Sequence, residues 1–281
     1  MSIKLIALDL DGTTLRKNHI SLSSQNCRTI SAAIGKGIIV VPATVRYLQG
    51  IPHSIRKLAG IRYVITSNGA CITDLQNGKE IYSNTIPDEK ALQIVDKTKR
   101  LNIFTEVYCA GLAYSEPGEM PAFVRKNLFF RIFAKLRKVE KVEDIPAFIR
   151  EIGKPVEKIE CFPDDTRIRT ELETELSGCN MTVTTSGMNS VEITNRGANK
   201  GSALAFLSEY IDIKSEEVMA IGDNCNDVEM LKWSGLAVAV ENADSALKQI
   251  ADFVTLSFDK NGVAHAIKRL CSIEKIKRGL L

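Results

Sequence analysis

Short apolar segments alternate with helix-like segments near both ends of the chain, and this alternation limits the fold more than any other feature. The apolar segments are residues 3–8, 37–41, 63–66, 218–221, 236–240 and 253–255, and the helix-like segments are residues 21–36, 51–58, 201–210 and 227–233. Continuous β-branched runs such as residues 38–41 are typical of strands buried on both faces of a parallel sheet. The two ends of the chain therefore predict a Rossmann-like α/β core, with a parallel sheet covered by helices on both faces.

The middle of the chain follows a different pattern. Apolar and polar residues alternate along residues 80–82, 104–108, 112–115, 156–162, 181–185 and 191–194, and residues 91–101 and 168–176 are helix candidates. Alternation with period two is typical of an antiparallel sheet that packs helices on one face. We therefore expect a discontinuous core of residues 1–82 and 190–281 and an inserted α+β domain of residues 83–189. A chain of 281 residues is long enough for two domains.

Charge and composition exclude several classes of partner. Lys and Arg total 37 against 34 Asp and Glu, so the net charge of +3 does not favour nucleic-acid binding. No apolar run approaches the roughly 18 residues of a membrane helix, and the N-terminus lacks a signal-peptide pattern. The seven cysteines include no C-x-x-C pair, which is typical of reduced thiols in the cytoplasm. We expect a cytoplasmic monomer or homodimer that binds a small metabolite.

Residues 125–141 are unusually basic, with seven Lys or Arg and a single acid, Glu140. An apolar stripe runs through the same segment. A helix on a membrane surface is one interpretation. The alternative, which we favour, is a solvated basic face whose apolar stripe packs on the inserted sheet.

Carboxylates gather after two of the predicted parallel strands. Asp9 and Asp11 follow the first strand with Gly12 at a sharp turn, and Asp223 and Asp227 follow the strand of residues 218–221. The carboxyl ends of parallel strands meet at one edge of a sheet, where ligands bind. Close carboxylates repel each other, and a hard divalent cation is their natural partner. The alternatives are that Asp9 and Asp11 form an ordinary turn and that Asp227 caps a helix.

Polar residues after the other predicted strands extend this set. Thr44 and Arg46 follow the second strand, Asn68 follows the third, and Lys200 begins a later helix where its charge offsets the acids. A nucleophilic carboxylate, a second carboxyl group, a hydroxyl and a lysine suit phosphoryl transfer. The chain has no G-x-x-x-x-G-K-[ST] loop and no G-x-G-x-x-G, so neither nucleotide binding through a P-loop nor a nicotinamide enzyme on this type of sheet has support.

The order and spacing of five motifs resemble those of a known family. The motifs are DLDGT at residues 9–13, ATVR at 43–46, SNGA at 67–70, NKG at 199–201 and GDNCNDVEML at 222–231. Across essentially the whole chain they resemble the haloacid dehalogenase superfamily, and within it the Cof-type phosphatases with an inserted α+β cap of the C2B type. The resemblance implies Mg²⁺-dependent hydrolysis of small organic phosphomonoesters, such as sugar phosphates or phosphorylated cofactors, through an aspartyl-phosphate.

The resemblance also implies roles for single residues. Asp9 would be the nucleophile, and Asp11 would protonate the leaving oxygen and then activate water. Mg²⁺ would be held by Asp9, Asp11 through its backbone carbonyl, and Asp223, with support from Asp227. Thr44 and Lys200 would hold the phosphoryl group, and the remaining phosphate- or substrate-binding candidates are Gly12, Arg46, Asn68 and Asn226.

One residue departs from the family pattern, and two other functions stay open. The family has Gly where this chain has Val45, which would be strained at a positive φ or would otherwise narrow the substrate entrance. The same site could serve a phosphomutase or phosphotransferase if water were excluded. It could also serve a regulatory module that binds a phosphorylated ligand without turnover.

Overall fold

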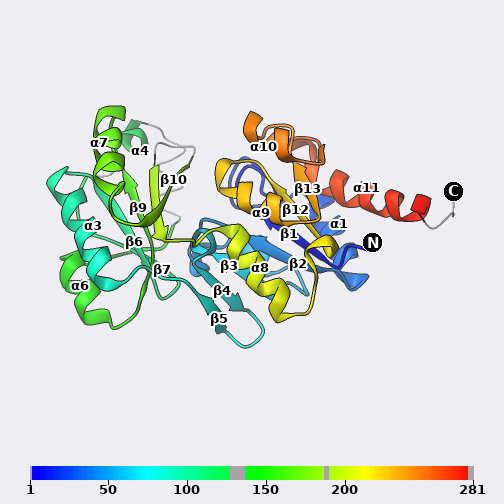
Figure 1. Ribbon diagram of the computed structural model, residues 1–281, viewed down its shortest axis with the longest axis horizontal. Coiled ribbons are helices and arrows are strands. Elements are labelled where there is room, and N and C mark those ends of the chain that lie inside the picture. Colours follow the sequence, from blue (N-terminus) through cyan, green and yellow to red (C-terminus); the bar gives the residue numbers. More distant parts are fainter. Residues whose placement is uncertain (1, 120, 127–136, 187–189, 278–281) are drawn as a thin grey trace. The chain divides into compact units, whose positions relative to one another are not determined.

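The computed structural model describes residues 2–119, 121–126, 137–186 and 190–277, and the chain divides into two units (Figure 1). The first unit contains the chain up to Thr44, residues Ile51–Tyr82 and the chain from Asn199 onward. The second contains Val45–Gly50 and Ser83–Ala198. The division returns the chain to the first unit at Asn199, later than the expected residue 190, because β11 (Ser190–Asn195) pairs within the second sheet.

An eight-stranded sheet forms the centre of the first unit, in the order β14-β13-β12-β1-β2-β3-β4-β5. Its strands are β1 (Leu5–Asp9), β2 (Ile39–Ala43), β3 (Tyr63–Thr66), β4 (Cys71–Asp74), β5 (Lys79–Ser83), β12 (Val218–Gly222), β13 (Leu236–Ala239) and β14 (Phe253–Val254). The strands from β14 to β3 are parallel. Every residue of β1 and β12 is buried, as expected for continuous apolar strands covered on both faces.

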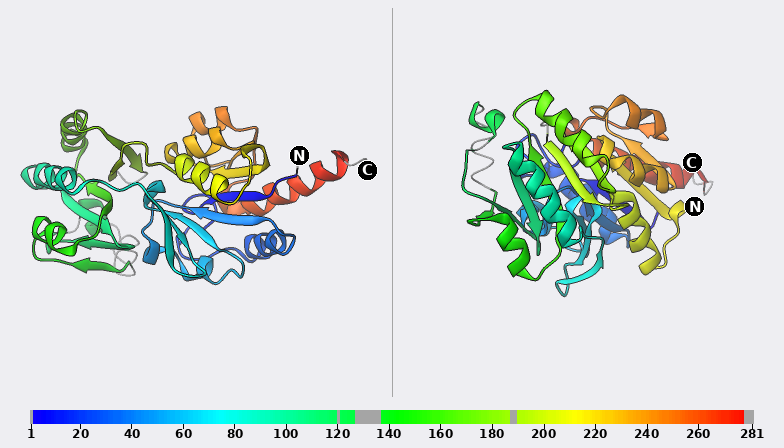
Figure 2. Two further views of the ribbon diagram at one scale, coloured as in Figure 1. Left: turned by 60° about the horizontal axis from the view of Figure 1, so that its bottom comes forward. Right: turned by 60° about the vertical axis from the view of Figure 1, so that its left-hand side comes forward.

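Helices cover both faces of this sheet (Figure 2). They are α1 (Ser24–Gly35), α2 (His53–Arg56), α8 (Lys200–Tyr210), α9 (Val228–Trp233), α10 (Ser245–Ile250) and α11 (Gly262–Lys277). Helix α1 packs against α11, and α8 packs against α9 on the other face. Short 3₁₀ turns lie at Leu48–Gly50, Ser67–Gly69, Ser215–Glu217, Cys225–Asp227 and Phe258–Lys260. The predicted α/β core is confirmed.

One edge of the first sheet differs from the prediction. Strand β4 pairs antiparallel with β3, and β5 lies next to β4 at the edge of this sheet. Residues 80–82, which their alternation grouped with the strands of the middle of the chain, therefore belong to the first sheet, and that grouping was wrong. Alternation with period two shows that a strand has one exposed face, but it does not show which sheet the strand joins.

A six-stranded sheet forms the centre of the second unit, in the order β10-β11-β9-β6-β7-β8. Its other strands are β6 (Phe104–Cys109), β7 (Leu112–Ser115), β8 (Val139–Lys141), β9 (Val156–Phe162) and β10 (Met181–Ser186), and its helices are α3 (Asp88–Arg100), α4 (Ala122–Lys126), α6 (Ile145–Ile152) and α7 (Thr166–Leu176). The sheet is antiparallel as predicted, except that β8 runs parallel to β7.

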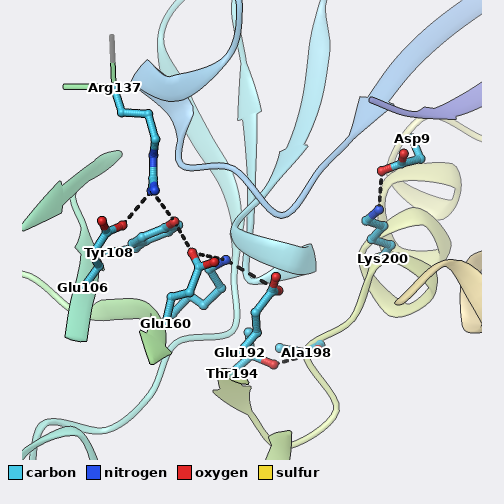
Figure 3. A network of polar contacts seen from close by, with 10 residues as sticks. Asp9, Glu106, Tyr108, Arg137, Glu160, Glu192, Thr194, Ala198 and Lys200 are labelled. Atoms are coloured by element: carbon cyan, nitrogen blue, oxygen red, sulfur yellow. Dashed lines mark hydrogen bonds and ion pairs between the residues drawn. The ribbon is translucent and has the colours of Figure 1, made fainter. Parts of the chain in front are cut away.

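The two faces of the second sheet have opposite character. Val107, Ile159 and Ile193 point to an apolar core that they share with residues of α3, α6 and α7. On the other face, Glu106, Glu160 and Glu192 form one cross-strand row (Figure 3). Their counter-charges come from Arg137 and Lys158, which lie 2.6 Å from Glu106 and 3.2 Å from Glu160. Alternation along the strands produces this separation.

The basic segment of residues 125–141 lies largely outside the described residues, which include only 125–126 and 137–141 of it. A helix on a membrane surface and a solvated basic face packed on the inserted sheet therefore both remain predictions for this segment. Among the helices that the structure describes, none combines the length and the apolar character needed to cross a membrane.

Candidate active site

The parallel strands bring the sequence motifs of the first unit to one edge of its sheet. Strand β1 ends at Asp9, β2 ends just before Thr44, and β12 ends just before Asp223. Neighbouring positions confirm the register, because Asp9 lies opposite Ala43 and Leu8 lies opposite Pro42. Residues far apart in the sequence therefore meet at the carboxyl ends of the strands.

Lys200 is the central cation of this edge. Its Nζ lies 2.6 Å from Asp9 Oδ1 and 2.7 Å from Asp227 Oδ1, and its side chain is fully buried. Figure 3 shows the Lys200 ammonium group directed at the Asp9 carboxylate. Lys200 is the first residue of α8, whose start is fixed by a capping box between Asn199 and Ser202. The helix start therefore sets where the ammonium group lies.

Asp227 binds Lys200 through one oxygen and the backbone of the loop after β12 through the other. Its second oxygen, Oδ2, accepts hydrogen bonds from the backbone N–H groups of Asp223 (2.9 Å) and Asn224 (3.2 Å). Thr13 Oγ1 donates to Asp223 Oδ1 at 2.8 Å, which ties the first motif to the last. Gly12 has a φ of +79°, and a Cβ there would lie 2.3 Å from Asp223 Oδ2. Only glycine allows this close approach of the two loops.

Three carboxylates of this cluster could hold a metal ion. Asp9, Asp223 and Asp227 each offer an oxygen, and these oxygens lie within 4.8 Å of one another. Asp9 Oδ2 is buried, and no hydrogen-bond donor among the described residues reaches it. Buried polar atoms normally have a partner. A hard divalent cation fits this set, since it prefers carboxylate oxygens and would satisfy the remaining Asp9 oxygen.

The pKa values reflect burial first and the crowding of carboxylates second. Burial raises the pKa of Asp9 well above its usual value, Lys200 lowers it in part, and Asp227 and Asp223 raise it further. The pKa of Asp223 rises to about 6, first through burial and then through the charge of Asp227. Burial disfavours the Lys200 ammonium, but Asp227 and Asp9 more than offset this and raise the pKa of Lys200. The site therefore favours an added cation.

The second and third motifs meet next to this cluster. Thr44 is fully buried, and its carbonyl oxygen accepts a hydrogen bond from the Asn68 N–H at 3.0 Å. Ser67, Asn68 and Gly69 all have positive φ values, of 50°, 58° and 91°. A Cβ on Gly69 would lie 2.1 Å from the carbonyl oxygen of Asn199, directly before Lys200. This left-handed turn brings the third motif against the start of α8.

Other predicted site residues are described by contacts outside the carboxylate cluster. Asp11 is partly exposed and contacts His19, with 2.7 Å between Oδ1 and Nδ1. Arg46 belongs to the second unit and donates to the carbonyl oxygen of Gly50 at 3.1 Å. Asn226 is half-buried in the turn Cys225–Asp227. Val45 is not among the residues with positive φ, so backbone strain is excluded there and the alternative, a narrower substrate entrance, stays a prediction.

Sequence reasoning assigned no role to three residues that contact the motifs. Thr13 could have been found, because it belongs to the first motif. His19 carried no signal, since the approach of its ring to Asp11 depends on the intervening loop. Asn242 donates to the Gly12 carbonyl oxygen at 2.8 Å across a separation of 230 residues, which no local pattern reports.

Comparison with known proteins identifies relatives along the whole chain. The sequence profile of the haloacid dehalogenase-like hydrolases matches residues 6–267. Phosphatase YwpJ of Bacillus subtilis is 31% identical over 287 residues, which cover 95% of this chain and 100% of that protein. The 5-amino-6-(5-phospho-D-ribitylamino)uracil phosphatase YwtE of the same organism is also 31% identical, over 96% of this chain and 99% of its own length.

Solved structures show the same architecture. A haloacid dehalogenase-like hydrolase from Bacillus subtilis matches with a TM-score of 0.86 and 29% identity, covering 95% of this chain and 99% of that one. A second from Bacteroides thetaiotaomicron matches with a TM-score of 0.81 and 28% identity, over 96% and 100% of the two chains. The fold of both units is therefore shared with hydrolases of this kind.

Proposed function

Because this chain belongs to the haloacid dehalogenase-like hydrolase family and is an enzyme of the phosphatase type, we propose a mechanism for it. We propose that it is a Mg²⁺-dependent phosphatase that works through an aspartyl-phosphate. Its substrates are small organic phosphomonoesters. The observation that carries the proposal is the buried Asp9 carboxylate, whose Oδ1 is paired with Lys200 and whose Oδ2 meets no donor in the described part of the chain. A buried carboxylate held by a lysine through one oxygen and open to a cation at the other suits a nucleophile that must approach a phosphate dianion.

The reaction has two steps in this proposal. A carboxylate oxygen of Asp9 forms a bond to phosphorus while the bond to the ester oxygen breaks, and Asp11 gives its proton to that leaving oxygen. Water then attacks phosphorus, Asp11 takes a proton from it, and Asp9 is released with inorganic phosphate. Thr44 and Lys200 bind phosphoryl oxygens. Proton transfer by a positioned carboxyl group contributes about 10²–10⁴-fold to such reactions.

Asp9, Asp223 and Asp227 would hold the metal ion, with the Asp11 carbonyl as a further oxygen. A bound Mg²⁺ supplies positive charge next to the phosphoryl oxygens, which lets a carboxylate approach a phosphate dianion. Lys200 supplies the protein's own positive charge at the same place, and Asp227 orients Lys200 through their contact. We assign the first unit as the catalytic core and the second as the cap.

The proposed substrate class is supported by the chemistry of the site and by the names of two relatives. The name of YwtE specifies a phosphate ester on a ribityl group, and that of YcsE, 29% identical, specifies the same compound. This supports a polyhydroxylated phosphate ester, such as a sugar phosphate or a phosphorylated cofactor precursor, as the substrate of this chain. We propose that the protein acts on such metabolites in the cytoplasm, as a monomer or homodimer.

The proposal is tested by phosphate release from p-nitrophenyl phosphate and a panel of phosphorylated metabolites. We expect turnover with Mg²⁺, none with excess EDTA, and none for Asp9→Asn, which keeps the shape but removes the nucleophile. Asp223→Ala should raise the Mg²⁺ concentration needed for half-maximal activity or abolish activity. Full activity in EDTA, or steady turnover by Asp9→Asn, would contradict the mechanism. Transfer of the phosphoryl group to an added alcohol in place of water would indicate a phosphotransferase.

A further inference from the structure

We propose that His19 is a positioning residue that holds the Asp11 carboxyl group for proton transfer to the ester oxygen and, in the second step, from water. The inference rests on the proposed function, in which Asp11 supplies and takes that proton. His19 acts through Asp11 and does not touch the phosphoryl group. The proposal starts from the 2.7 Å contact between His19 Nδ1 and Asp11 Oδ1.

The contact contributes little to the stability of the fold. The His19 and Asp11 side chains are 35% and 27% exposed. Pairs at such partly exposed positions contribute little to the free energy of unfolding. Both residues also lie outside regular elements, in the loop between β1 and α1. A short contact between two partly exposed loop residues is therefore better explained by a role in the chemistry of the site.

A hydrogen-bonded turn fixes the backbone of His19 and, with it, the direction of its ring. His19 has a φ of +55°, a left-handed conformation that is uncommon for residues other than glycine. Its N–H donates to the Arg16 carbonyl oxygen, and the Arg16 N–H donates to the Ser21 carbonyl oxygen, each at 2.8 Å. The Asn18 side chain accepts from the backbone N–H groups of Ile20 and Ser21, both at 3.0 Å. Four hydrogen bonds thus close the turn that carries the strained residue.

Asp11 needs such support because no strand fixes it. Strand β1 ends at Asp9, and Gly12 follows Asp11 with a φ of +79°. A carboxyl group on a loop turns about its side-chain bonds, and the hydrogen bond from His19 to Oδ1 restricts that rotation. With Oδ1 accepting from the ring, Oδ2 is the oxygen that carries the transferred proton. Holding a reacting group in one orientation is a large part of catalytic rate enhancement.

The inference predicts a dependence on the leaving group. An alkoxide leaves poorly and requires the proton from Asp11, whereas a dinitrophenolate leaves without it. The test is kcat/KM for 2,4-dinitrophenyl, p-nitrophenyl, phenyl and simple alkyl phosphates, because kcat/KM reports the step that breaks the ester bond. His19→Gly removes the ring and accepts the left-handed backbone. We expect a loss of about 10- to 100-fold on alkyl phosphates and less than about 3-fold on the dinitrophenyl ester.

A conservative variant separates positioning from folding. Asn tolerates the left-handed conformation and places an amide nitrogen where the imidazole has Nδ1, so His19→Asn should recover most of the loss on alkyl phosphates. Lys17→Ala in the same turn and His53→Ala on α2 are matched exposed controls and should leave the whole series unchanged. Melting temperatures of all variants accompany the kinetics.

Each kinetic result either supports or overturns the proposed role of His19. A graded loss with recovery by Asn supports the inference. An equal loss on every ester, or no loss, overturns it while the proposed function stands, provided that wild type turns over and Asp9→Asn does not. If Asp9→Asn retains activity, the proposed function fails first and the inference falls with it.

Discussion

At the scale of single residues, the buried ammonium group of Lys200 is the positive charge shared by two buried carboxylates. It lies between Asp9 and Asp227 with none of its side chain exposed. Removing one partner of a buried ionic group leaves the others unpaired in a medium of low polarity. Lys200 therefore links the stability of the first unit to the chemistry of its site.

We predict that Lys200→Met lowers the free energy of unfolding by about 3–5 kcal/mol, because two buried carboxylates lose their counter-charge. Activity should be lost as well. Urea unfolding followed by circular dichroism measures the first effect. Lys232→Met is the matched control, since Lys232 is 56% exposed on α9, and it should change stability by less than about 0.5 kcal/mol. Equal stability of Lys200→Met and wild type would refute the prediction.

At the scale of elements, the turn Ser67–Gly69 decides where α8 begins relative to the sheet. Its three left-handed residues bring Gly69 against the peptide between Asn199 and Lys200. Such conformations cost about 1–3 kcal/mol each for residues other than glycine, and they persist where the surrounding structure fixes them. The position of the Lys200 side chain therefore depends on Gly69, which contacts only the backbone of Asn199 and Lys200.

Gly69→Ala should reduce kcat by at least about tenfold and also lower the melting temperature, since the new Cβ must displace the Asn199 carbonyl and with it Lys200. Gly78→Ala is a matched control with a similar φ of +70° and nothing within 4 Å of the added Cβ. It carries the same kind of backbone strain without the clash. A comparable loss of activity in both variants would show that strain alone is responsible.

The hairpin of β3 and β4 provides a second test at this scale, through pH. Hydrogen bonds from Arg62 Nε and Nη2 to Asp74 Oδ2, at 3.1 and 2.9 Å, lower the pKa of Asp74. A carboxylate with a lowered pKa in the folded state adds stability above its unfolded pKa of about 3.9, and this stability is lost as pH falls through the folded pKa.

Asp74→Asn should therefore be less stable than wild type at pH 7, and the difference should shrink steadily below about pH 4. The midpoints of urea unfolding at pH 7 and at about pH 3 measure this difference in stability. Asp96→Asn, at a 70% exposed position on α3, should show almost no difference at either pH. A difference for Asp74→Asn that grows on acidification would contradict the assignment.

At the scale of the whole molecule, the chain passes between its two units at four places, after Thr44, Gly50, Tyr82 and Ala198. The short segment Val45–Gly50 is attached to the second unit by several contacts. Gln49 N–H donates to the Gly111 carbonyl oxygen at 2.9 Å, and the Tyr47 ring lies edge-on to Tyr108 with 5.2 Å between centroids. Val45 is thus the residue at which the chain leaves the proposed phosphoryl-binding Thr44 for the other unit.

Val45→Gly should raise kcat/KM for bulky phosphate esters by about tenfold and change small esters little, because removing the side chain opens space and relieves no strain. The measurement is a series of esters of increasing size with wild type and variant. A uniform change across the series would mean that Val45 affects the common chemical step. In that case its proposed effect on substrate size would be wrong.

The sequence alone determined the parallel core and the insertion, because apolar runs and period-two alternation are local consequences of burial on two faces or on one. It also placed Asp9, Thr44 and Asp223 at strand ends, and parallel strands bring such ends together. These predictions needed no knowledge of which segments pair.

Only the tertiary structure decided the rest, because partners distant in the chain leave no local pattern. It placed Lys200 between Asp9 and Asp227, joined β5 to the first sheet, and attached Val45–Gly50 to the second unit. The approach of His19 to Asp11 likewise depends on a closed turn. Periodicity shows which side of a helix or strand is buried. The side chains that pack against that side come from segments remote in the sequence, and only the tertiary structure identifies them.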